Sequence, residues 1–124
     1  MNVQLLPAAR EEIEVLRASG YRGVGFLLGS TIGRFALVER LLPLDFGRRG
    51  SDAVFTAASR KYGERLLGAF FCRKPPFALD WLVGDLVLAV RPGQVQAFTC
   101  EFDNARRKAR LAPLLEDAEA TWPN

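Results

Sequence analysis

The groups most capable of chemistry in this chain lie around one short stretch, Cys72-Arg73-Lys74, with Asp85 thirteen positions after the cysteine. A thiol beside two cations can have a lowered pKa and act as a nucleophile. A thiolate and a carboxylate are also ligands of metal ions. These residue types therefore indicate two chemistries, covalent catalysis at Cys72 and metal binding by Cys72 and Asp85.

The composition restricts both chemistries, because the chain contains no histidine. Histidine is the usual base for a cysteine or serine nucleophile and the commonest metal ligand. A catalytic zinc needs about three protein ligands and a water, and this stretch supplies two. We therefore expect no metal or other cofactor, and we expect Cys72 to be an unreactive thiol at a strand end. Cys100 lies in an alternating run and is expected to be a reduced thiol in the core.

The overall composition is that of one globular domain spanning residues 1–124. Hydrophobic residues make up 49% and charged residues 25%, which is the composition of an ordinary globular protein rather than of a disordered chain. The net charge of +3 is explained as well by solubility as by an acidic partner. No signal pattern or membrane-spanning apolar run is visible, which predicts a cytoplasmic protein.

The elements that would position these groups follow from the apolar periodicity. A helix is predicted at 7–18, where Pro7 suits the first position and Gly20 a left-handed end, and another at 52–62. Apolar or alternating runs predict strands at the following ranges: 3–6, 24–29, 35–42, 66–72, 86–90 and 95–102. This order predicts an α+β fold with a single curved, mixed and mostly antiparallel sheet flanked by helices.

Turn residues predict where the strands end. We expect a turn at Thr31–Gly33, and we expect Pro43 to end the strand that follows it. After a turn at Asp103-Asn104, alternation over Lys108–Leu111 favours a final strand. A helix from Asn104 is the alternative, although Pro113 would break it.

Two stretches together resemble the JAB/MPN (Mov34-like) domain family, which includes zinc isopeptidases that cleave ubiquitin-like proteins. The first is the G-F-L-L-G strand of Gly25–Gly29, followed by a strand that ends in Leu-Pro. The second is residues 66–85, LLGAFFCRKPPFALDWLVGD, where an apolar strand is followed by the family's metal-binding loop. The similarity extends from helix 7–18 to about residue 102. It implies a JAB/MPN-like, cytidine-deaminase-like architecture.

In active members of that family, a glutamate base lies three residues before the first glycine, and a His-x-His-Pro follows the central strand. A serine that supports the oxyanion and an aspartate ligand come ten and thirteen residues after the first histidine. The matching positions here are, in chain order, Arg22, Cys72, Lys74, Leu82 and Asp85, with Pro75 retained. An arginine cannot act as a base, a lysine repels zinc, and a leucine donates no hydrogen bond. The resemblance therefore implies a degenerate, metal-free site and a pseudoenzyme.

Asp85, the retained carboxylate, has two interpretations. It is either a remnant of the metal site, or a side chain that pairs with Lys74 or Arg22 or caps a turn around residues 80–85. The second is favoured, because a buried carboxylate without a partner is unstable.

The loop after Cys72 predicts a surface for another protein chain. Pro75 and Pro76 stiffen it, apolar side chains could anchor a partner, and a basic rim could steer an acidic one. The sequence leaves open whether the apolar side chains form an exposed groove or pack inside. The candidate partner-binding residues are Arg73, Lys74, Phe77, Leu79 and Trp81.

The function hypothesis is a non-catalytic JAB/MPN-fold module that binds or scaffolds another protein chain. That chain is a second copy of this one or, by the resemblance, a ubiquitin-like protein. The alternative is a divergent hydrolase or isopeptidase that uses Cys72 or a metal site completed by a partner. A third hypothesis is nucleic-acid binding through Arg106–Lys108 and Arg110, but the absence of interleaved aromatic residues favours a solvated face.

Overall fold

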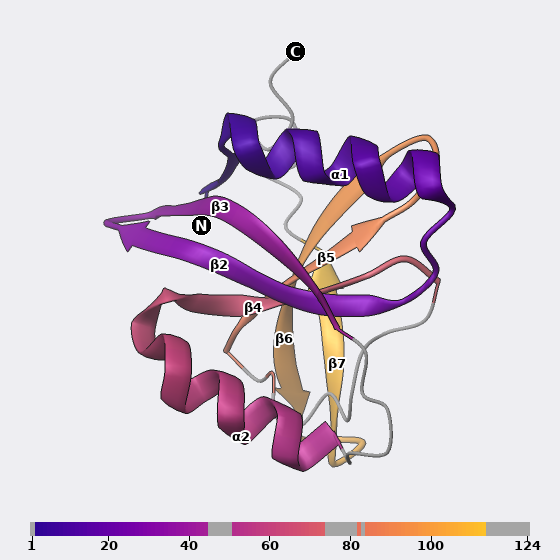
Figure 1. Ribbon diagram of the computed structural model, residues 1–124. Helices are drawn as coiled ribbons and strands as arrows, with labels where there is room; N and C mark the ends of the chain where they lie inside the picture. The colour runs from indigo at the N-terminus through magenta and orange to yellow at the C-terminus, as the bar shows by residue number, and fades with distance from the viewer. Residues whose placement is uncertain (1, 45–50, 74–81, 83, 114–124) are drawn as a thin grey trace.

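The computed structural model describes residues 2–44, 51–73, 82 and 84–113, and within these ranges one sheet carries a helix on each face (Figure 1). The elements in chain order are β1 (Asn2–Leu5), α1 (Pro7–Ser19), β2 (Val24–Ile32), β3 (Phe35–Leu44), α2 (Ser51–Tyr62), the short 3-10 helix η1 (Gly63–Arg65), β4 (Leu66–Phe71), β5 (Leu86–Val90), β6 (Val95–Asp103) and β7 (Lys108–Pro113).

The seven described strands follow the order β1-β3-β2-β4-β5-β6-β7 across a curled sheet (Figure 1). The pairs β1–β3 and β4–β5 are parallel, and the other neighbouring pairs are antiparallel. This confirms the predicted α+β class with a mixed, mostly antiparallel sheet flanked by helices. No helix in the described ranges has both the length and the apolar character needed to cross a bilayer.

Helix α1 covers one face of the sheet through three residues at helical spacing, Ala9, Ile13 and Leu16, all buried. Pro7 occupies the start of the helix, where the missing N–H has no intrahelical partner to lose. Gly20 ends it with a φ of 71°, and its backbone N–H donates to the carbonyl of Arg17 at 3.2 Å. The helix predicted at 7–18 is therefore confirmed, with one further residue.

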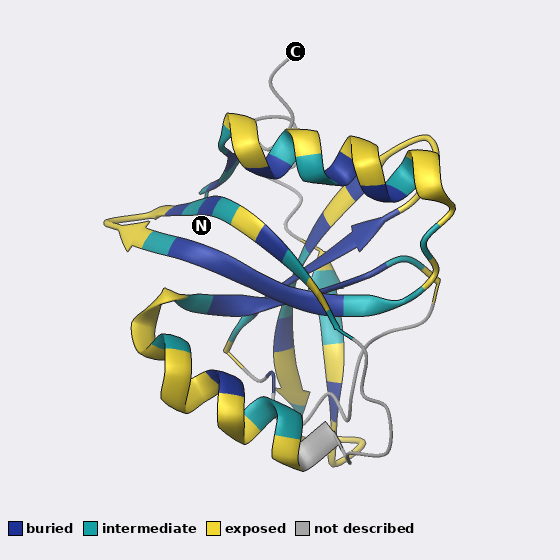
Figure 2. Cartoon of the chain, in the orientation of Figure 1, coloured by how far each residue is buried: buried dark blue, intermediate teal, exposed yellow. Residues whose placement is uncertain are grey.

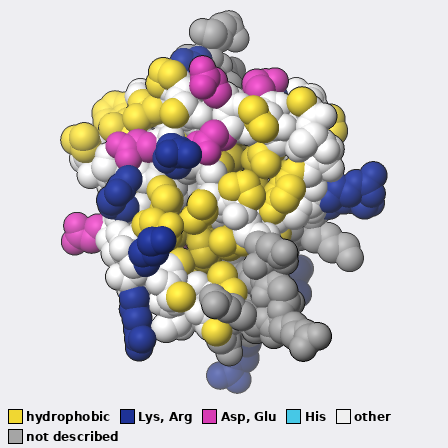
Figure 3. Space-filling view, in the orientation of Figure 1, with side chains coloured by type: hydrophobic (Ala, Val, Ile, Leu, Met, Phe, Trp, Pro, Cys, Tyr) yellow, Lys and Arg dark blue, Asp and Glu magenta, His cyan; other side chains and the backbone are white. Residues whose placement is uncertain are grey.

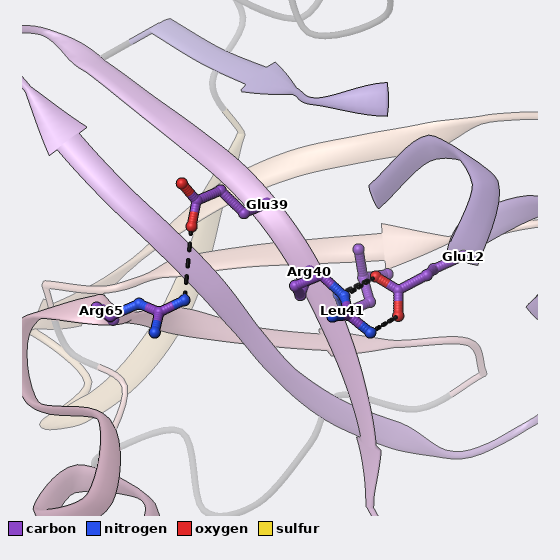
Figure 4. Close-up of polar contacts among 5 residues, drawn as sticks. All are labelled: Glu12, Glu39, Arg40, Leu41 and Arg65. Carbon is purple, nitrogen blue, oxygen red and sulfur yellow. Dashed lines mark hydrogen bonds and ion pairs between the residues drawn. The ribbon is translucent and has the colours of Figure 1, made fainter. Parts of the chain in front are cut away.

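A salt bridge at the sheet surface adds to this apolar docking of α1 (Figure 4). Arg40 of β3 donates to Glu12 of α1 from Nε at 2.9 Å and from Nη2 at 3.2 Å, and the backbone N–H of Leu41 donates to the same carboxylate at 3.2 Å. A second pair, Arg65 with Glu39, is longer at 3.7 Å. Both pairs are largely exposed, so apolar burial contributes most to the docking.

The second core lies on the opposite face, under α2. Phe55 of α2 packs against it and makes an edge contact with Phe26, with ring centroids 6.2 Å apart. The side chain of Cys100 is only 2% exposed and lies in this core, as the alternation of its strand predicts. Figure 2 shows the result, with buried residues along the centres of β2, β4 and β5 and exposed residues on the outer sides of both helices.

The hairpin between β2 and β3 differs from the prediction, because β2 continues past Gly29 to Ile32. Thr31 and Ile32 pair with Ala36 and Phe35, so the predicted turn at Thr31–Gly33 is wrong. The chain reverses instead at Gly33 and Arg34, where Gly33 has a φ of 59°. A two-residue hairpin with glycine first has the twist that antiparallel strands favour, which lets the strands extend to the turn.

Two prolines lie inside strands. Pro43 does not end β3, which runs to Leu44, because β1 pairs with β3 only along Phe35–Val38 and none of the described strands borders β3 on that side at Pro43. Pro113 is the last residue of β7 at the edge of the sheet. The final strand is thus confirmed and the alternative helix is wrong.

Candidate functional site

Three of the positions singled out from the sequence, Arg22, Cys72 and Arg73, line one cavity of about 500 Å³. The cavity lies beyond the carboxyl ends of β4 and β5, where Phe71 is followed by Cys72 and Val90 by Arg91. These two strands are parallel, and ligand sites of open sheets commonly form beyond the carboxyl ends of parallel strands. We therefore take this cavity as the candidate site. Because arginines line it, we call it the arginine pocket.

Local backbone contacts hold the walls of the arginine pocket together. The backbone N–H of Cys72 donates to the carbonyl of Gly23 at 3.0 Å, which places the chain after β4 beside the chain before β2. The hydroxyl of Tyr21 lies 2.8 Å from the carbonyl oxygen of Val24 and 3.3 Å from that of Leu44. These bonds keep Arg22 and Arg73 on neighbouring segments at the same end of the sheet.

The pocket is strongly positive. Among the described residues, four arginines line it, Arg17, Arg22, Arg73 and Arg91, and no aspartate or glutamate does. Arg17 is held by an ion pair with Glu14 at 2.8 Å, and its Nε donates to the backbone carbonyl of Arg91 at 3.1 Å. The guanidinium of Arg91 stands 5.7 Å from the ring centroid of Phe71, within the range of a cation–π contact.

Cys72 does not have the features of an activated nucleophile. Burial raises the pKa of its thiol, whereas catalytic cysteines have a lowered pKa. The thiol is therefore mainly protonated at neutral pH, despite the arginines nearby. This argues against the hydrolase hypothesis based on Cys72.

Asp85 lies at the other end of the parallel pair. The register of β4 and β5 aligns Gly68 with Leu86 and Phe71 with Ala89, so Asp85 is level with Leu67. Five residue steps separate that level from Cys72, which is about 16 Å at the rise of a strand. Asp85 and Cys72 cannot share one ion across this distance, and the interpretation in which Asp85 pairs with Arg22 is wrong.

Asp85 instead closes a turn before β5. Its backbone N–H donates to the carbonyl of Leu82 at 2.7 Å, and its carbonyl accepts from the backbone N–H of Cys100 at 3.1 Å. These bonds come from the backbone of Asp85, whereas the prediction was that its side chain caps the turn. Burial of the carboxyl group raises its pKa from 3.8 to about 6.

Replacing Asp85 with asparagine is expected to stabilise the protein above pH 6 and to have no effect near pH 4. Because the pKa is raised in the folded state, that state binds the proton more tightly, so the free energy of unfolding falls as pH rises from about 4 to 6. The side chain is only half-buried, so the expected gain is about 1 kcal/mol. Urea unfolding of both proteins at pH 4, 5, 6 and 7.5 measures it, and a difference that grows toward pH 4 would contradict the sign.

Leu82, at the position of the family's serine, is fully buried in the second core beside Phe71 and Val87. It is therefore a packing residue and not part of the arginine pocket. The other predicted partner-binding residues, and the two prolines that stiffen the loop, lie outside the described residues: Lys74, Pro75, Pro76, Phe77, Leu79 and Trp81. Across the ranges that are described, no three cysteine, aspartate or glutamate side chains gather in a way that could hold a metal ion.

Two residues of the site were missed by the sequence reasoning, Arg17 and Arg91. Arg17 ends a helix and Arg91 begins a turn, and neither position carries a motif. The Arg-Pro-Gly turn after an apolar strand would have indicated a binding crevice only if β4 and β5 had been recognised as parallel neighbours.

The basic run after β6 lies away from the site, on a tight turn. The carboxylate of Asp103 accepts from the backbone N–H groups of Ala105 at 3.0 Å and Arg106 at 3.2 Å, which orders the turn. Arg106, Arg107, Lys108 and Arg110 are all exposed. The nucleic-acid hypothesis for this run stays untested.

The described chain thus belongs to the class of α+β proteins built on one curled, mixed seven-stranded sheet. Among solved structures it is similar to the solution structure of protein DSY2949 from Desulfitobacterium hafniense, a target of the Northeast Structural Genomics Consortium, with 19% identity, a TM-score of 0.51 and 90% of each chain covered. At this identity the likeness concerns the fold alone. No protein-family profile and no curated protein matches the sequence.

Proposed function

We propose that this chain is a non-catalytic module of JAB/MPN-like architecture that binds another protein through the basic edge formed by Arg22 and Arg73. The observation that carries the proposal is the convergence of these two arginines with Cys72 at one end of the sheet. Arg22 stands at the position of the family's base, and Cys72 at that of its first zinc ligand. Active members of that family bind a zinc ion at these positions, whereas this chain has the positively charged side chains of Arg22 and Arg73 there.

The same arrangement indicates the chemistry of the partner. Arg22 and Arg73 are exposed, so they are accessible to an approaching surface. Exposed cations at the margin of an interface accelerate association with acidic partners and disfavour basic ones. The partner is therefore an acidic segment of another protein chain. The face of this chain seen in Figure 3 is mixed, with acidic side chains mostly in its upper part and basic ones at its left, right and lower margins.

Charge reversal tests this proposal. Tagged wild type, an Arg22→Glu/Arg73→Glu double variant and an Arg34→Glu control are to be isolated from the native cells and compared by quantitative mass spectrometry and sedimentation velocity. Arg34 is an exposed arginine in the turn between β2 and β3, so the control reverses one positive charge elsewhere, which is half of the charge change in the double variant. We expect a stoichiometric protein partner, or a dimer, that is retained by the control and weakened about tenfold or more in the double variant.

Two outcomes would overturn the proposal. The first is a monomer with no stoichiometric partner, or a partner that all three proteins retain equally. The second is isopeptidase turnover by the wild type that a chelator abolishes, because that result would restore the alternative of an enzyme completed by a metal.

A further inference from the structure

We propose that the arginine pocket is a binding site for the oxyanion group of a small ligand, a carboxylate or a phosphate. This site goes beyond the protein contact proposed above, since it involves Arg17 and Arg91 as well as Arg22 and Arg73. The argument rests on charge, on the fixed positions of two guanidinium groups, and on the shape of the cavity.

The first step is the charge of the cavity. Four guanidinium groups line a space of about 500 Å³, and no carboxylate from the described part of the chain lines it. Within the described residues, Glu14 pairs with Arg17, and Arg22, Arg73 and Arg91 form no ion pair with a carboxylate. Burial keeps the Cys72 thiol neutral, so it adds no compensating charge. Like charges that line one cavity repel each other, and a bound anion relieves that repulsion.

The second step is the fixed geometry of the wall. The guanidinium of Arg17 donates to the carboxylate of Glu14 at 2.8 Å and to the backbone carbonyl of Arg91 at 3.1 Å, and its side chain is only 25% exposed. Arg91 lies over the ring of Phe71. Guanidinium groups that are already ordered lose less entropy when they bind a ligand. Arginine is also the residue whose planar donor pairs match carboxylate and phosphate oxygens.

The third step is the size and place of the cavity. A volume of about 500 Å³ falls in the range of sites for small molecules. The carboxyl ends of β4 and β5 border it, and the apolar side chains of Leu16 and Val90 form part of its lining. An anionic group with a small apolar body therefore fits both the charge and the lining. Carboxylates and phosphate esters share this chemistry, so the test separates them.

Isothermal titration calorimetry with inorganic phosphate and with succinate, at constant ionic strength set by sodium chloride, tests the site. The proteins are wild type, Arg91→Gln, Arg22→Gln and the control Arg34→Gln, each checked for folding by circular dichroism. We expect at least one probe to bind the wild type and the control equally, and each pocket variant to bind about tenfold more weakly. Tighter phosphate binding assigns a phosphate ester, and tighter succinate binding assigns a carboxylate.

The same data can overturn the proposal. It fails if neither probe binds the wild type at 10 mM, a concentration about tenfold above a millimolar dissociation constant. It also fails if Arg91→Gln and Arg22→Gln bind as well as Arg34→Gln. These failures are distinct from failure of the protein-binding proposal, because the calorimetry contains no second protein and the partner experiment contains no added phosphate or succinate.

Discussion

Replacing Gly68 with alanine is expected to lower the free energy of unfolding by about 4 kcal/mol, a large share of the total for a domain of this size. Gly68 lies in β4 opposite Leu86 of β5, in the parallel pair. A Cβ atom there would stand 1.7 Å from the carbonyl oxygen of Leu86 and 2.9 Å from its nitrogen. Both atoms are backbone, so the clash can be relieved only by moving the two strands apart.

Urea unfolding followed by circular dichroism measures this effect, with Gly93→Ala as the matched control. Gly93 lies in the turn between β5 and β6, and a Cβ atom there would meet nothing within 4 Å. The control is expected to change the free energy of unfolding by less than about 0.5 kcal/mol. The clash is expected to cost about 4 kcal/mol. If the free energy of unfolding of Gly68→Ala were instead within about 1 kcal/mol of the wild-type value, the close approach of β4 and β5 would be wrong.

This close approach also bears on the site, because the parallel pair carries Cys72 and Arg91 at its carboxyl ends. If β4 and β5 separate, the two walls of the arginine pocket separate with them. Partial destabilisation at Gly68 should therefore weaken anion binding even where the fold survives. The geometry of the arginine pocket therefore depends on the close packing of β4 against β5.

The helices and the succession of strands along the chain, though not the order of the strands in the sheet, could be predicted from the sequence because their signals are local. Pro7 and Gly20 mark the ends of α1 by their own backbone preferences. The strand ends at Ile32 and Leu44 were predicted less well. Thr31 and Pro43 look like turn or break residues, but their place in the sheet depends on neighbouring strands that a local pattern does not contain.

The site was predicted only in part, for a related reason. Arg22 and Cys72 were brought together by motif spacing, and the bond between Cys72 and Gly23 places their segments side by side. Asp85 was selected by counting thirteen residues from Cys72, which is the spacing between the zinc ligands of JAB/MPN proteins. That count assumed that both residues lie at the same end of the sheet. Here the chain returns to the start of a parallel strand, so the same count ends about 16 Å away. Arg17 and Arg91 are 74 residues apart, and no local pattern links them.

The second large effect is expected at Leu82. The active JAB/MPN proteins that the sequence resembles have a serine at the matching position. Leu82→Ser should lower the free energy of unfolding by about 3–5 kcal/mol. The side chain is 0% exposed and packs in the second core with Phe71, Val87 and Cys100. The substitution removes apolar contacts, leaves a cavity, and buries a hydroxyl group among apolar side chains.

Leu82→Met is the control, because it conserves volume and apolar character and should change stability by less than about 1.5 kcal/mol. Urea unfolding of the three proteins measures the difference, and an isopeptidase assay is run in parallel with and without zinc. We expect the serine variant to lose stability and to gain no turnover, since Leu82 belongs to the core rather than the arginine pocket. If Leu82→Ser were as stable as Leu82→Met and cleaved an isopeptide bond, residue 82 would have to lie at the arginine pocket and not in the second core.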